Sequence, residues 1–596
     1  MRVPGPLTAR AFGSLPASLS ETGGAGGSSL LDSLTAQDAA LRRLHGGSWP
    51  PAEPPEFVSV LKQARPATSP TVVDVDVAVC GGTLGLLLAC ALQLQGHRVA
   101  VVEAGPLRGR AQDWNTSGEE LQALVRAGVL DASELASVAP LRFGPMACRF
   151  GPATPDQWEL QLGGVLDVGV SPNALLRCVR ARFEAAGGLV LERTPIRGVA
   201  VYEDGASLDI GTQAGVPGEE GLPTSVHARL VVDCMGHRSP IALQQRAGQR
   251  PDGVCVQVGS CARGPWAAQW QQRGDFFVTS SDAVRGGPRG RAALQYFYQA
   301  FPSSGGSDER STYLFTYLRP GVEMPSLLDV MEDYWAGLPA YQRIGTSDSE
   351  GGEGGEGGEG GEGERGSGVV GAGAGAGAGA LSQVDVQRIV FGWFPTYRRG
   401  APLPPRFDRV LSVGDASAVQ SPISFGGFCA MLRHLPRYTR GLDLALREDR
   451  LARGDLARLT PYLPNLGTAW MSAAAMTARD AGPPPAAGAS GAEVEVEAAG
   501  GAGAGGATGV EVSSELAELA EPPYTLVNDL LEGNFKVMAD LPRAQALVFF
   551  RDVTTLNTLG AVLLGQTVTM APLLPRVMAE LVSPLELLEF SGHYLS

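Results

Sequence analysis

Hydrophobic runs and glycine turns alternate along residues 73–245, and the same pattern returns in residues 405–460. Residues 75–79 form a short apolar run, a glycine-rich turn follows, and a longer apolar stretch without helix breakers comes next. This order predicts a strand, a tight turn and a helix, and "RVAVVE" predicts a second strand. Two later runs, "ARLVVD" and "RVLSV", also end in turns. We therefore expect an α/β fold with a Rossmann-type domain in two parts, 73–245 and 405–460.

The region between those two parts has a different pattern, in which aromatic and β-branched residues alternate with others. Its runs are "GVCVQVGSCA", "DFFVTS", "AALQYFYQAF" and "STYLFTYL". A period of two predicts an inserted, mostly antiparallel β-sheet substrate domain, with a first part at 246–345 and a last part at 381–404. Such a sheet suits the floor of an apolar cavity. We interpret its aromatic side chains as sheet core, some of them lining a ligand tunnel: Tyr296, Phe297, Tyr298, Tyr313, Phe315 and Tyr317.

Two low-complexity segments carry most of the net charge of −15. "EGGEGGEGGEGGEGE" and "GAGAGAGAGA" lie in 346–380, and a second Gly- and Glu-rich linker spans 481–521. Neither segment can bury apolar surface, so we expect solvated loops. The rest of the chain is nearly neutral and offers no basic face, which excludes nucleic-acid binding. Residues 461–596 are expected to form a helical C-terminal region that contains the second linker.

The N-terminal residues 1–72 include Arg2 and Arg10 but no acidic residue before Glu21. This composition is typical of an organelle transit peptide followed by a flexible segment. The eight cysteines form no CxxC pair and the six histidines lack metal-ligand spacing. We therefore expect free thiols and no metal site.

The turn after the first strand has the composition of a dinucleotide site. Cys80 replaces the first glycine of the GxGxxG fingerprint, and the glycine after it supplies the lost backbone freedom. The helix that follows offers free N–H groups to phosphates. Glu103 ends the second strand 21 residues after Gly82, a position suited to ribose hydroxyls. The predicted contacts within the turn are Gly81, Gly82, Thr83, Leu84 and Gly85.

Two later segments resemble flavoproteins of the aromatic-hydroxylase and geranylgeranyl-reductase type. They are "ARLVVDCMGHRSPI" and "RVLSVGDASAVQSPISFGGF". In that family the aspartate at the strand end binds the ribityl chain of FAD, and a glycine pair approaches the flavin ring. The resemblance assigns Gly414, Asp415, Gly426 and Gly427 to the cofactor, with a helix N-cap as the alternative role of Asp415. Arg110, in the loop after the ribose-binding strand, is a further predicted FAD contact.

Longer motifs resemble the CruA/CruP lycopene cyclase family, and its CruP type most. They include "QDWNTSGEELQALVRAGVL", "LFTYLRP", "FGWFPTYRRGAPLPPRFDRVLSVGDASAVQSPISFGGF" and "VNDLLEGNFKVMADL". The resemblance runs from about residue 73 to the C-terminus, apart from the low-complexity segments. It implies a FAD-dependent lycopene beta-cyclase-like flavoprotein of carotenoid biosynthesis, a lycopene-like lipid substrate, and a chloroplast location peripheral to the thylakoid membrane.

Cyclisation of a polyene end group is redox-neutral and requires a positioned acid in a dry, apolar cavity. In related cyclases reduced FAD stabilises the cation-like transition state, and a carboxylate in a strand motif supplies the proton. The corresponding segment here, "TYLFTYLRP", contains no acid. Glu323, Glu332 and Asp333 lie just beyond it, but they suit the exposed side of a helix, and no catalytic residue is assigned.

Two other functions stay open because of the missing acid. The first is a flavin-dependent redox enzyme, a hydroxylase or prenyl reductase, with NAD(P)H as reductant. It is favoured by "DCMGHRSPI", which is near the motif that serves both flavin and NADPH in hydroxylases. The second is a non-catalytic, photoprotective regulator that binds flavin and carotenoid.

Overall fold

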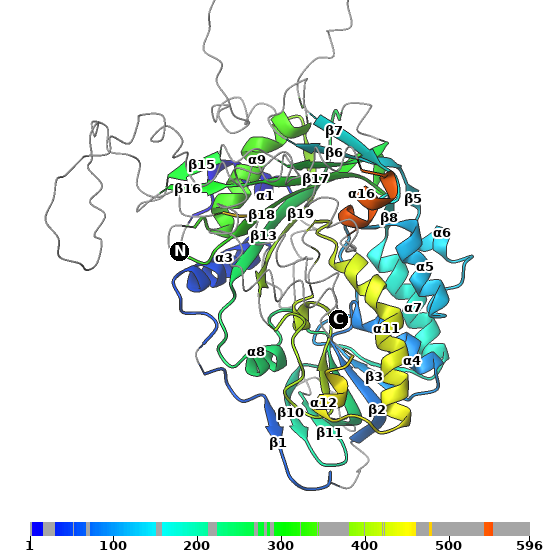
Figure 1. Cartoon of the computed structure of the whole chain (residues 1–596). Helices are drawn as coiled ribbons and strands as arrows, with labels where there is room; N and C mark the ends of the chain where they lie inside the picture. Colours follow the sequence, from blue (N-terminus) through cyan, green and yellow to red (C-terminus); the bar gives the residue numbers. More distant parts are fainter. Residues whose placement is uncertain are drawn as a thin grey trace, which may run out of the picture.

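The structure of the 596-residue chain is a computed structural model (Figure 1). It describes residues 3–15, 30–51, 53–66, 72–150, 158–211, 223–266, 272–278, 283–286, 291–321, 324–342, 344, 381–397, 400–419, 421, 423–459, 476–478 and 541–551. Both predicted low-complexity segments, 346–380 and 481–521, lie outside the described residues, so their solvated loops stay a prediction.

The first sheet contains the predicted Rossmann strands (Figure 1). Its described strands follow the order β1, β10, β11, β12, β2, β3 and β9, and β20 also pairs with β12. In that order they span Val58–Val60, Ile196–Val201, Ala206–Ile210, Ser225–Asp233, Val72–Cys80, Val99–Val102, Leu189–Leu191 and Val410–Ser412. Strands β2, β3, β9, β12 and β20 run parallel, so their carboxyl ends share one edge. At this edge of open α/β sheets ligands commonly bind.

Helices cover one face of the first sheet with apolar side chains. α4 (Gly85–Leu94) directly follows the glycine turn, and all its residues from Gly85 to Leu92 are buried. It packs on α7 (Pro172–Ala185) and α11 (Gly427–Arg447). α11 also contacts α5 (Gly118–Arg126). A small sheet beside these helices is formed by β4 (Trp114–Thr116), β8 (Val168–Val170) and β5 (Leu141–Arg142).

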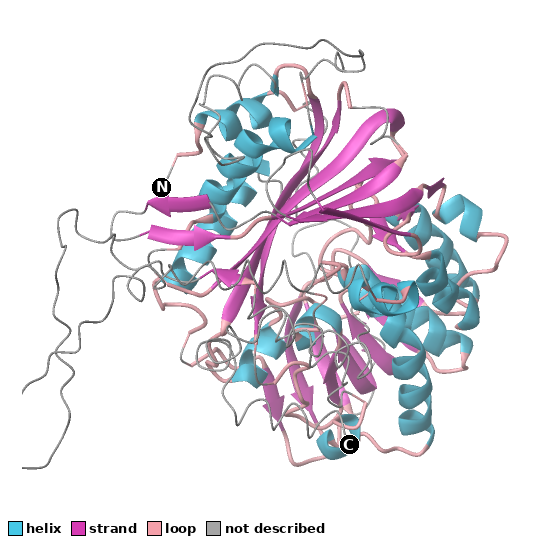
Figure 2. Cartoon of the chain, turned by 45° about the horizontal axis from the view of Figure 1, so that its top comes forward, coloured by secondary structure: helices cyan, strands magenta, loops and turns pink. Residues whose placement is uncertain are grey.

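The second sheet crosses above the first, and its strands run mostly antiparallel (Figure 2). In order, its described strands are β19 (Asp385–Thr396), β13 (Gly253–Arg263), β18 (Gly306–Leu318), β17 (Phe297–Ser303), β14 (Arg273–Val278), β6 (Gly144–Phe150) and β7 (Trp158–Leu162). The pair β14–β6 is parallel, as is the short β21 (Thr477–Ala478) beside β18. The predicted fold class, a Rossmann-type α/β domain with an inserted, mostly antiparallel sheet, is confirmed.

Alternation along the strands of the second sheet separates its aromatic residues onto two faces. On β18, Tyr313, Phe315 and Tyr317 belong to the core cluster that faces the first sheet, whereas Leu314 and Leu318 belong to the opposite cluster. The opposite face, called the back face here, is covered by α9 (Leu327–Gln342), α1 (Pro6–Gly13) and α3 (Leu30–His45). The front face is the one that looks toward the glycine turns.

The N-terminal segment corrects one expectation. Residues 1–72 were expected to be a transit peptide and flexible segment. Within them, α1 and α3 pack on α9 and contribute to the back-face core, so these two helices are ordered parts of the fold, while the transit peptide stays a prediction. Glu332 of α9 fastens α1: its carboxylate accepts hydrogen bonds from the backbone N of Leu7 at 2.9 Å and of Thr8 at 3.0 Å. The sequence missed this contact because the same arginines and serines suit a transit peptide and a short amphipathic helix equally well.

The remaining described elements are short. They are α6 (Leu135–Val138), α8 (Pro240–Arg246), α12 (Arg453–Leu456), α16 (Arg543–Phe550), the 3₁₀ turn η2 (Gly414–Ser417) and the hairpin of β15 (Ala283–Gly286) and β16 (Arg291–Leu294). Of the predicted helical C-terminal region 461–596, only 476–478 and 541–551 are described, and α16 lies there. Within the described part of the chain, no helix has the length and apolar character needed to cross a membrane.

Candidate functional site

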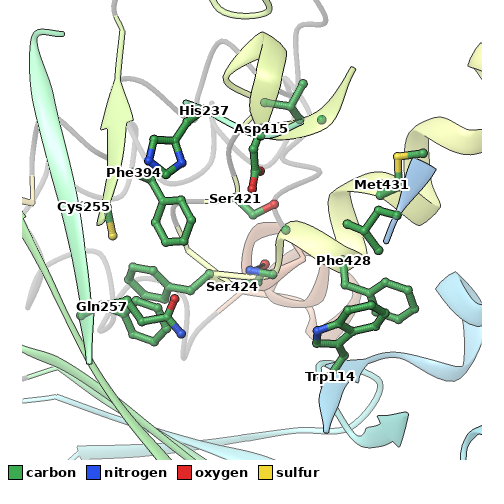
Figure 3. A pocket seen from close by; sticks show the side chains of 18 of the residues that line it. Trp114, His237, Cys255, Gln257, Phe394, Asp415, Ser421, Ser424, Phe428 and Met431 are labelled. Carbon is green, nitrogen blue, oxygen red and sulfur yellow. Dashed lines mark hydrogen bonds between the residues drawn. The ribbon is translucent and has the colours of Figure 1, made fainter. Parts of the chain in front are cut away.

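A cavity of about 400 Å³ lies between the carboxyl edge of the first sheet and the front face of the second sheet. Figure 3 shows Cys255, Gln257 and Phe394 of the second sheet on one side of it, and Trp114 and Phe428 on the opposite side. The turns of both sequence motifs reach it, since Thr83, Leu84, Gly85, Gly414, Asp415, Gly426 and Gly427 line it. The structure therefore brings the separate predicted motifs together.

The glycine turn after β2 is shaped by close backbone packing. Gly81 has φ +96°, and a Cβ there would lie 2.6 Å from the carbonyl oxygen of Cys234. A Cβ on Gly85 would lie 2.9 Å from Cγ1 of Val79, so only glycine lets α4 start against β2. Cys80 itself ends β2 as an ordinary strand residue, and Gly81 provides the left-handed step, as expected.

Glu103 lies against this turn. Its Oε2 accepts a hydrogen bond from the backbone N of Gly82 at 2.7 Å, and its Oε1 accepts one from Gly105 N at 3.1 Å. The end of β3 thus brings a carboxylate beside the start of α4, where the predicted ribose site requires it.

Asp233, at the end of β12, stabilises the site through buried hydrogen bonds. Its carboxylate is fully buried and accepts hydrogen bonds from Ser239 Oγ at 2.7 Å, Met235 N at 3.0 Å and Ser412 Oγ at 3.2 Å. Burial raises its pKa to about 6. Because these bonds join the turn after β12 to β20, Asp233 holds two of the cavity-lining segments in register.

Asp415 faces the cavity from η2, directly after β20. No described residue donates a hydrogen bond to its carboxylate, and a Cβ on Gly427 would lie 3.9 Å from Oδ1 across open space. It is accessible from the cavity but shielded from bulk water by the surrounding protein, which raises its pKa to about 6. The alternative role as a helix N-cap does not hold, because Gly426 caps α11.

The cavity wall formed by β4 and α11 is supported from behind by residues of α5 and α11 that the sequence did not point to. Arg433 of α11 donates to Glu120 Oε1 at 2.6 Å and to Ser421 Oγ at 3.1 Å, so it ties the loop before α11 to α5. Glu120 is also part of the capping box of α5, and "SGEE" is the signal from which that part was readable. Trp114 packs on Phe428 with ring centroids 4.8 Å apart.

Two polar side chains on the cavity wall differ in their hydrogen bonding. Asn115 lines the cavity, and its buried Nδ2 has no hydrogen-bond partner among the described residues. Arg110 donates to the carbonyl oxygens of Gln112 and Asp113 and, at 3.3 Å, to the Tyr313 hydroxyl. Arg110 therefore joins its own loop to the second sheet at the rim of the cavity, in addition to any contact with a ligand.

The front face of the second sheet closes the cavity with aromatic rings. Its lining residues are Cys255, Gln257, Gln299, Phe301, Tyr313, Phe315, Tyr317 and Phe394. His237 lies at this wall with its ring centroid 5.7 Å from that of Phe394, and burial lowers its pKa to about 4, so it is neutral. Of the described carboxylates, Asp415 is the one that lines the cavity.

Of the acidic residues beyond "TYLFTYLRP", the two that the structure describes do not line this cavity. Glu332 holds α1, and Asp333 accepts a hydrogen bond from the Tyr296 hydroxyl on the back face. Glu323 lies outside the described residues. The two that are described are partly or largely buried and serve packing, which differs from the solvent-exposed position expected for them.

No family model matches the chain, and no curated protein matches it in sequence. Among solved structures it is similar to a geranylgeranyl bacteriochlorophyll reductase-like protein from Thermoplasma acidophilum, with 12% identity over 85% of this chain and 99% of that chain and a TM-score of 0.50. A variant of halogenase PltM in complex with FAD has 11% identity, coverage of 87% and 96%, and a TM-score of 0.49. PqsL, a probable FAD-dependent monooxygenase from Pseudomonas aeruginosa, has 19% identity, coverage of 65% and 91%, and a TM-score of 0.42. The first similarity establishes a shared fold.

Proposed function

We propose that the chain is a FAD-dependent flavoenzyme that transfers hydrogen to an elongated, conjugated apolar substrate of the carotenoid class. One observation carries the proposal: a cavity joins the glycine turns of the first sheet to an aromatic wall, and no described carboxylate lies on that wall. The fold shared with the reductase-like protein supports hydrogen transfer. The motifs that resemble CruA/CruP proteins support the class of substrate and, as part of the same proposal, a chloroplast location at the thylakoid surface.

The residues present fit FAD. Gly427 leaves open space beside Asp415 that any side chain would enter, and no described residue donates to the Asp415 carboxylate. A ribityl hydroxyl would supply that donor, and Asn115 Nδ2 offers a buried donor to a ring oxygen or nitrogen. The turn of Gly82 and Glu103 provides the place for pyrophosphate and ribose.

When bound, FAD would supply two-electron hydride chemistry, with NAD(P)H as the proposed electron source. The chain's own residues would hold and shield the reactants. Asp415 would accept a hydrogen bond from the ribityl chain, and Trp114 and Phe428 close one side of the site. The rings of Phe315, Tyr317 and Phe394 would line the space for the polyene and exclude water. His237 stays neutral, so it places no positive charge beside the substrate.

Redox-neutral cyclisation of the lycopene end group is the second candidate. The aromatic wall favours it, since the faces of these rings stabilise a nearby cation. The reaction also needs an acid, and Asp415, with a pKa of about 6, is the described carboxyl group that faces the cavity. Asp415 would have to serve both the ribityl chain and the proton transfer, which is why cyclisation ranks second.

The two reactions differ in the composition of their products. FAD-loaded protein is incubated with lycopene in lipid vesicles, with NADPH in one series and dithionite in another, and the products are analysed by chromatography and mass spectrometry. A product that has gained hydrogens supports the proposal, and an isomer of lycopene with ring end groups supports cyclisation. An added oxygen indicates a hydroxylase, and unchanged, protein-bound lycopene indicates the regulator. Gly427→Val, which closes the cofactor space, is the matched control and should be inactive in every series.

A further inference from the structure

Phe425 lies where the half of the cavity lined by glycine turns meets the half lined by aromatic rings, called the aromatic half here. It directly precedes Gly426 and Gly427, and it lines the cavity together with Phe315 and Tyr317 of the second sheet. Its backbone has φ +53°, and its N–H donates to the Ser421 carbonyl oxygen at 2.8 Å. A left-handed backbone is unfavourable for a bulky aromatic residue, so the surrounding packing must hold it.

That packing is an aromatic cluster on the front face. The Phe425 ring stacks on Phe315 with centroids 4.1 Å apart and an angle of 18° between the planes. Phe297, Tyr317 and Phe276 lie around it at centroid distances of 5.8, 5.9 and 6.2 Å. Phe315 and Phe297 are almost fully buried, whereas Phe425 is only half-buried, so part of its ring borders the cavity.

Behind Phe425 the protein is closed. Phe276 and Phe297 are 5% and 1% exposed, and Phe550 of α16 covers Phe276 edge-on at 6.2 Å. Neither Phe276 nor Phe550 lines the cavity. The Phe425 ring therefore separates the cavity from this buried apolar cluster, and a smaller side chain at this position would extend the cavity into apolar space rather than toward solvent.

We propose that Phe425 is the specificity-determining residue of the site: its ring limits the bulk of the substrate end group that can lie beside the cofactor. This inference rests on the proposed function, because it assumes a polyene in the aromatic half. A narrow, acyclic end group fits against the ring, and a bulkier cyclic end group collides with it. A residue that served only to fill the core would not need the unfavourable φ that aims this ring at the cavity.

The test compares two polyenes of equal composition, lycopene with acyclic end groups and β-carotene with cyclic ones. Binding to FAD-loaded protein in detergent micelles is measured by quenching of tryptophan fluorescence and by the shift of carotenoid absorbance. Wild type should prefer lycopene, and Phe425→Ala should raise the relative affinity for β-carotene roughly tenfold, the effect expected from relieving one steric contact. Phe276→Ala removes a ring from the same cluster but not from the cavity and should leave the ratio unchanged.

If the alanine variant does not fold, Phe425→Leu should change the relative affinity for β-carotene in the same direction with a smaller perturbation. Thermal unfolding and flavin absorbance establish that each variant is intact. An unchanged ratio in intact Phe425 variants overturns the inference while the proposed function stands. An equal change in Phe276→Ala also overturns it, because general loosening of the cluster would then be the cause. If FAD-loaded wild type binds neither carotenoid, the proposed substrate class fails and the inference fails with it.

Discussion

The two faces of the second sheet are built from the same strands and similar residues, yet one is a closed core and the other lines the cavity. On β19, Trp393 faces the back and packs on Trp49 with ring centroids 5.3 Å apart, while its neighbour Phe394 faces the cavity. On β17, Tyr298 packs against Tyr341 of α9 with tilted rings, and Phe297 joins the front cluster. Aromatic content alone therefore does not distinguish a core from a binding wall. What distinguishes the two is what lies against each face: helices cover the back face, and the cavity borders the front face.

The polar groups named on the two faces also differ in their surroundings. On the back face, Asp275 and Arg149 form a buried pair with 2.6 Å between Oδ2 and Nη2, and the Tyr334 hydroxyl bonds to Ser260 and Thr312. On the cavity side, Asp415 and Asn115 Nδ2 lack partners among the described residues. Buried polar atoms without a partner among the described residues also occur on the back face, at Trp335 Nε1 and Tyr341 Oη. The missing partner alone therefore does not mark a ligand site, and Asp415 and Asn115 differ from those atoms because they line the cavity.

The largest effect is expected from the back face. Trp393→Ala removes a side chain that is 2% exposed and is packed between α3 and the sheet. The loss should be about 3–5 kcal/mol in the free energy of unfolding, as for other buried tryptophans. Urea unfolding followed by circular dichroism measures it. A loss below about 1 kcal/mol would mean that the back face is not a closed core.

The adjacent residue on the front face should respond differently. Phe394→Ala removes a half-buried ring, so the cost in unfolding free energy should be about 1–2 kcal/mol. Binding of lycopene should weaken by roughly tenfold, because the ring forms part of the wall. The reference for this loss is the lycopene affinity of Trp393→Ala, measured at low denaturant. If Phe394→Ala costs as much stability as Trp393→Ala and leaves binding unchanged, the two faces do not differ in function.

The affinity for FAD should depend on pH through Asp415. Its pKa of about 6 in the free site falls when a ribityl hydroxyl donates to the carboxylate, so binding releases a proton. Affinity should therefore rise as the pH rises toward 6 and level off above it, with a change of at most about tenfold per pH unit below that value. Fluorescence titration with FAD from pH 5 to 8 measures the profile. Asp415→Asn should flatten it, and an unchanged profile in that variant would assign the titration to another group.

The smallest effect concerns the N-terminal helix. Glu332→Gln keeps the shape of the side chain but replaces one of the two oxygens that accept hydrogen bonds from Leu7 and Thr8. Unfolding free energy should fall by about 1 kcal/mol. Glu448→Gln, which breaks an exposed contact to Arg450, should change it by less than about 0.5 kcal/mol. Equal values for both variants would show that α1 does not contribute to the folded state.

The nucleotide half of the fold was predictable because its signals are local. The strand, the turn at Gly81–Gly85 and Glu103 lie within a short stretch, and backbone sterics dictate which positions must be glycine. The alternating pattern also predicted the second sheet. Its aromatic residues could not be assigned to faces, because the sequence does not state which side α9 and α1 will cover.

The parts that escaped prediction depend on partners far away in the chain. Arg433 reaches Glu120 over more than three hundred positions, and Glu332 is equally distant from Leu7. An arginine in "MLRHLPR" and an acid in "LLDVMEDYW" look like exposed helix residues until their partners are placed. Phe425 is similar: nothing in "SPISFGGF" announces its positive φ, which follows from stacking on Phe315.

We propose that FAD lies between the two sheets, in the space that Gly427 keeps open beside Asp415. The most direct measurement is a titration of apoprotein with FAD, followed by quenching of flavin fluorescence, for wild type, Gly427→Val and Gly163→Val. Gly163 is an exposed glycine whose Cβ would meet nothing within 4 Å, so its variant controls for the added side chain. Gly427→Val should weaken binding by more than about tenfold, a loss above ~1.4 kcal/mol, while Gly163→Val should match wild type. Equal affinity in all three proteins, each folded, would contradict the proposed cofactor site.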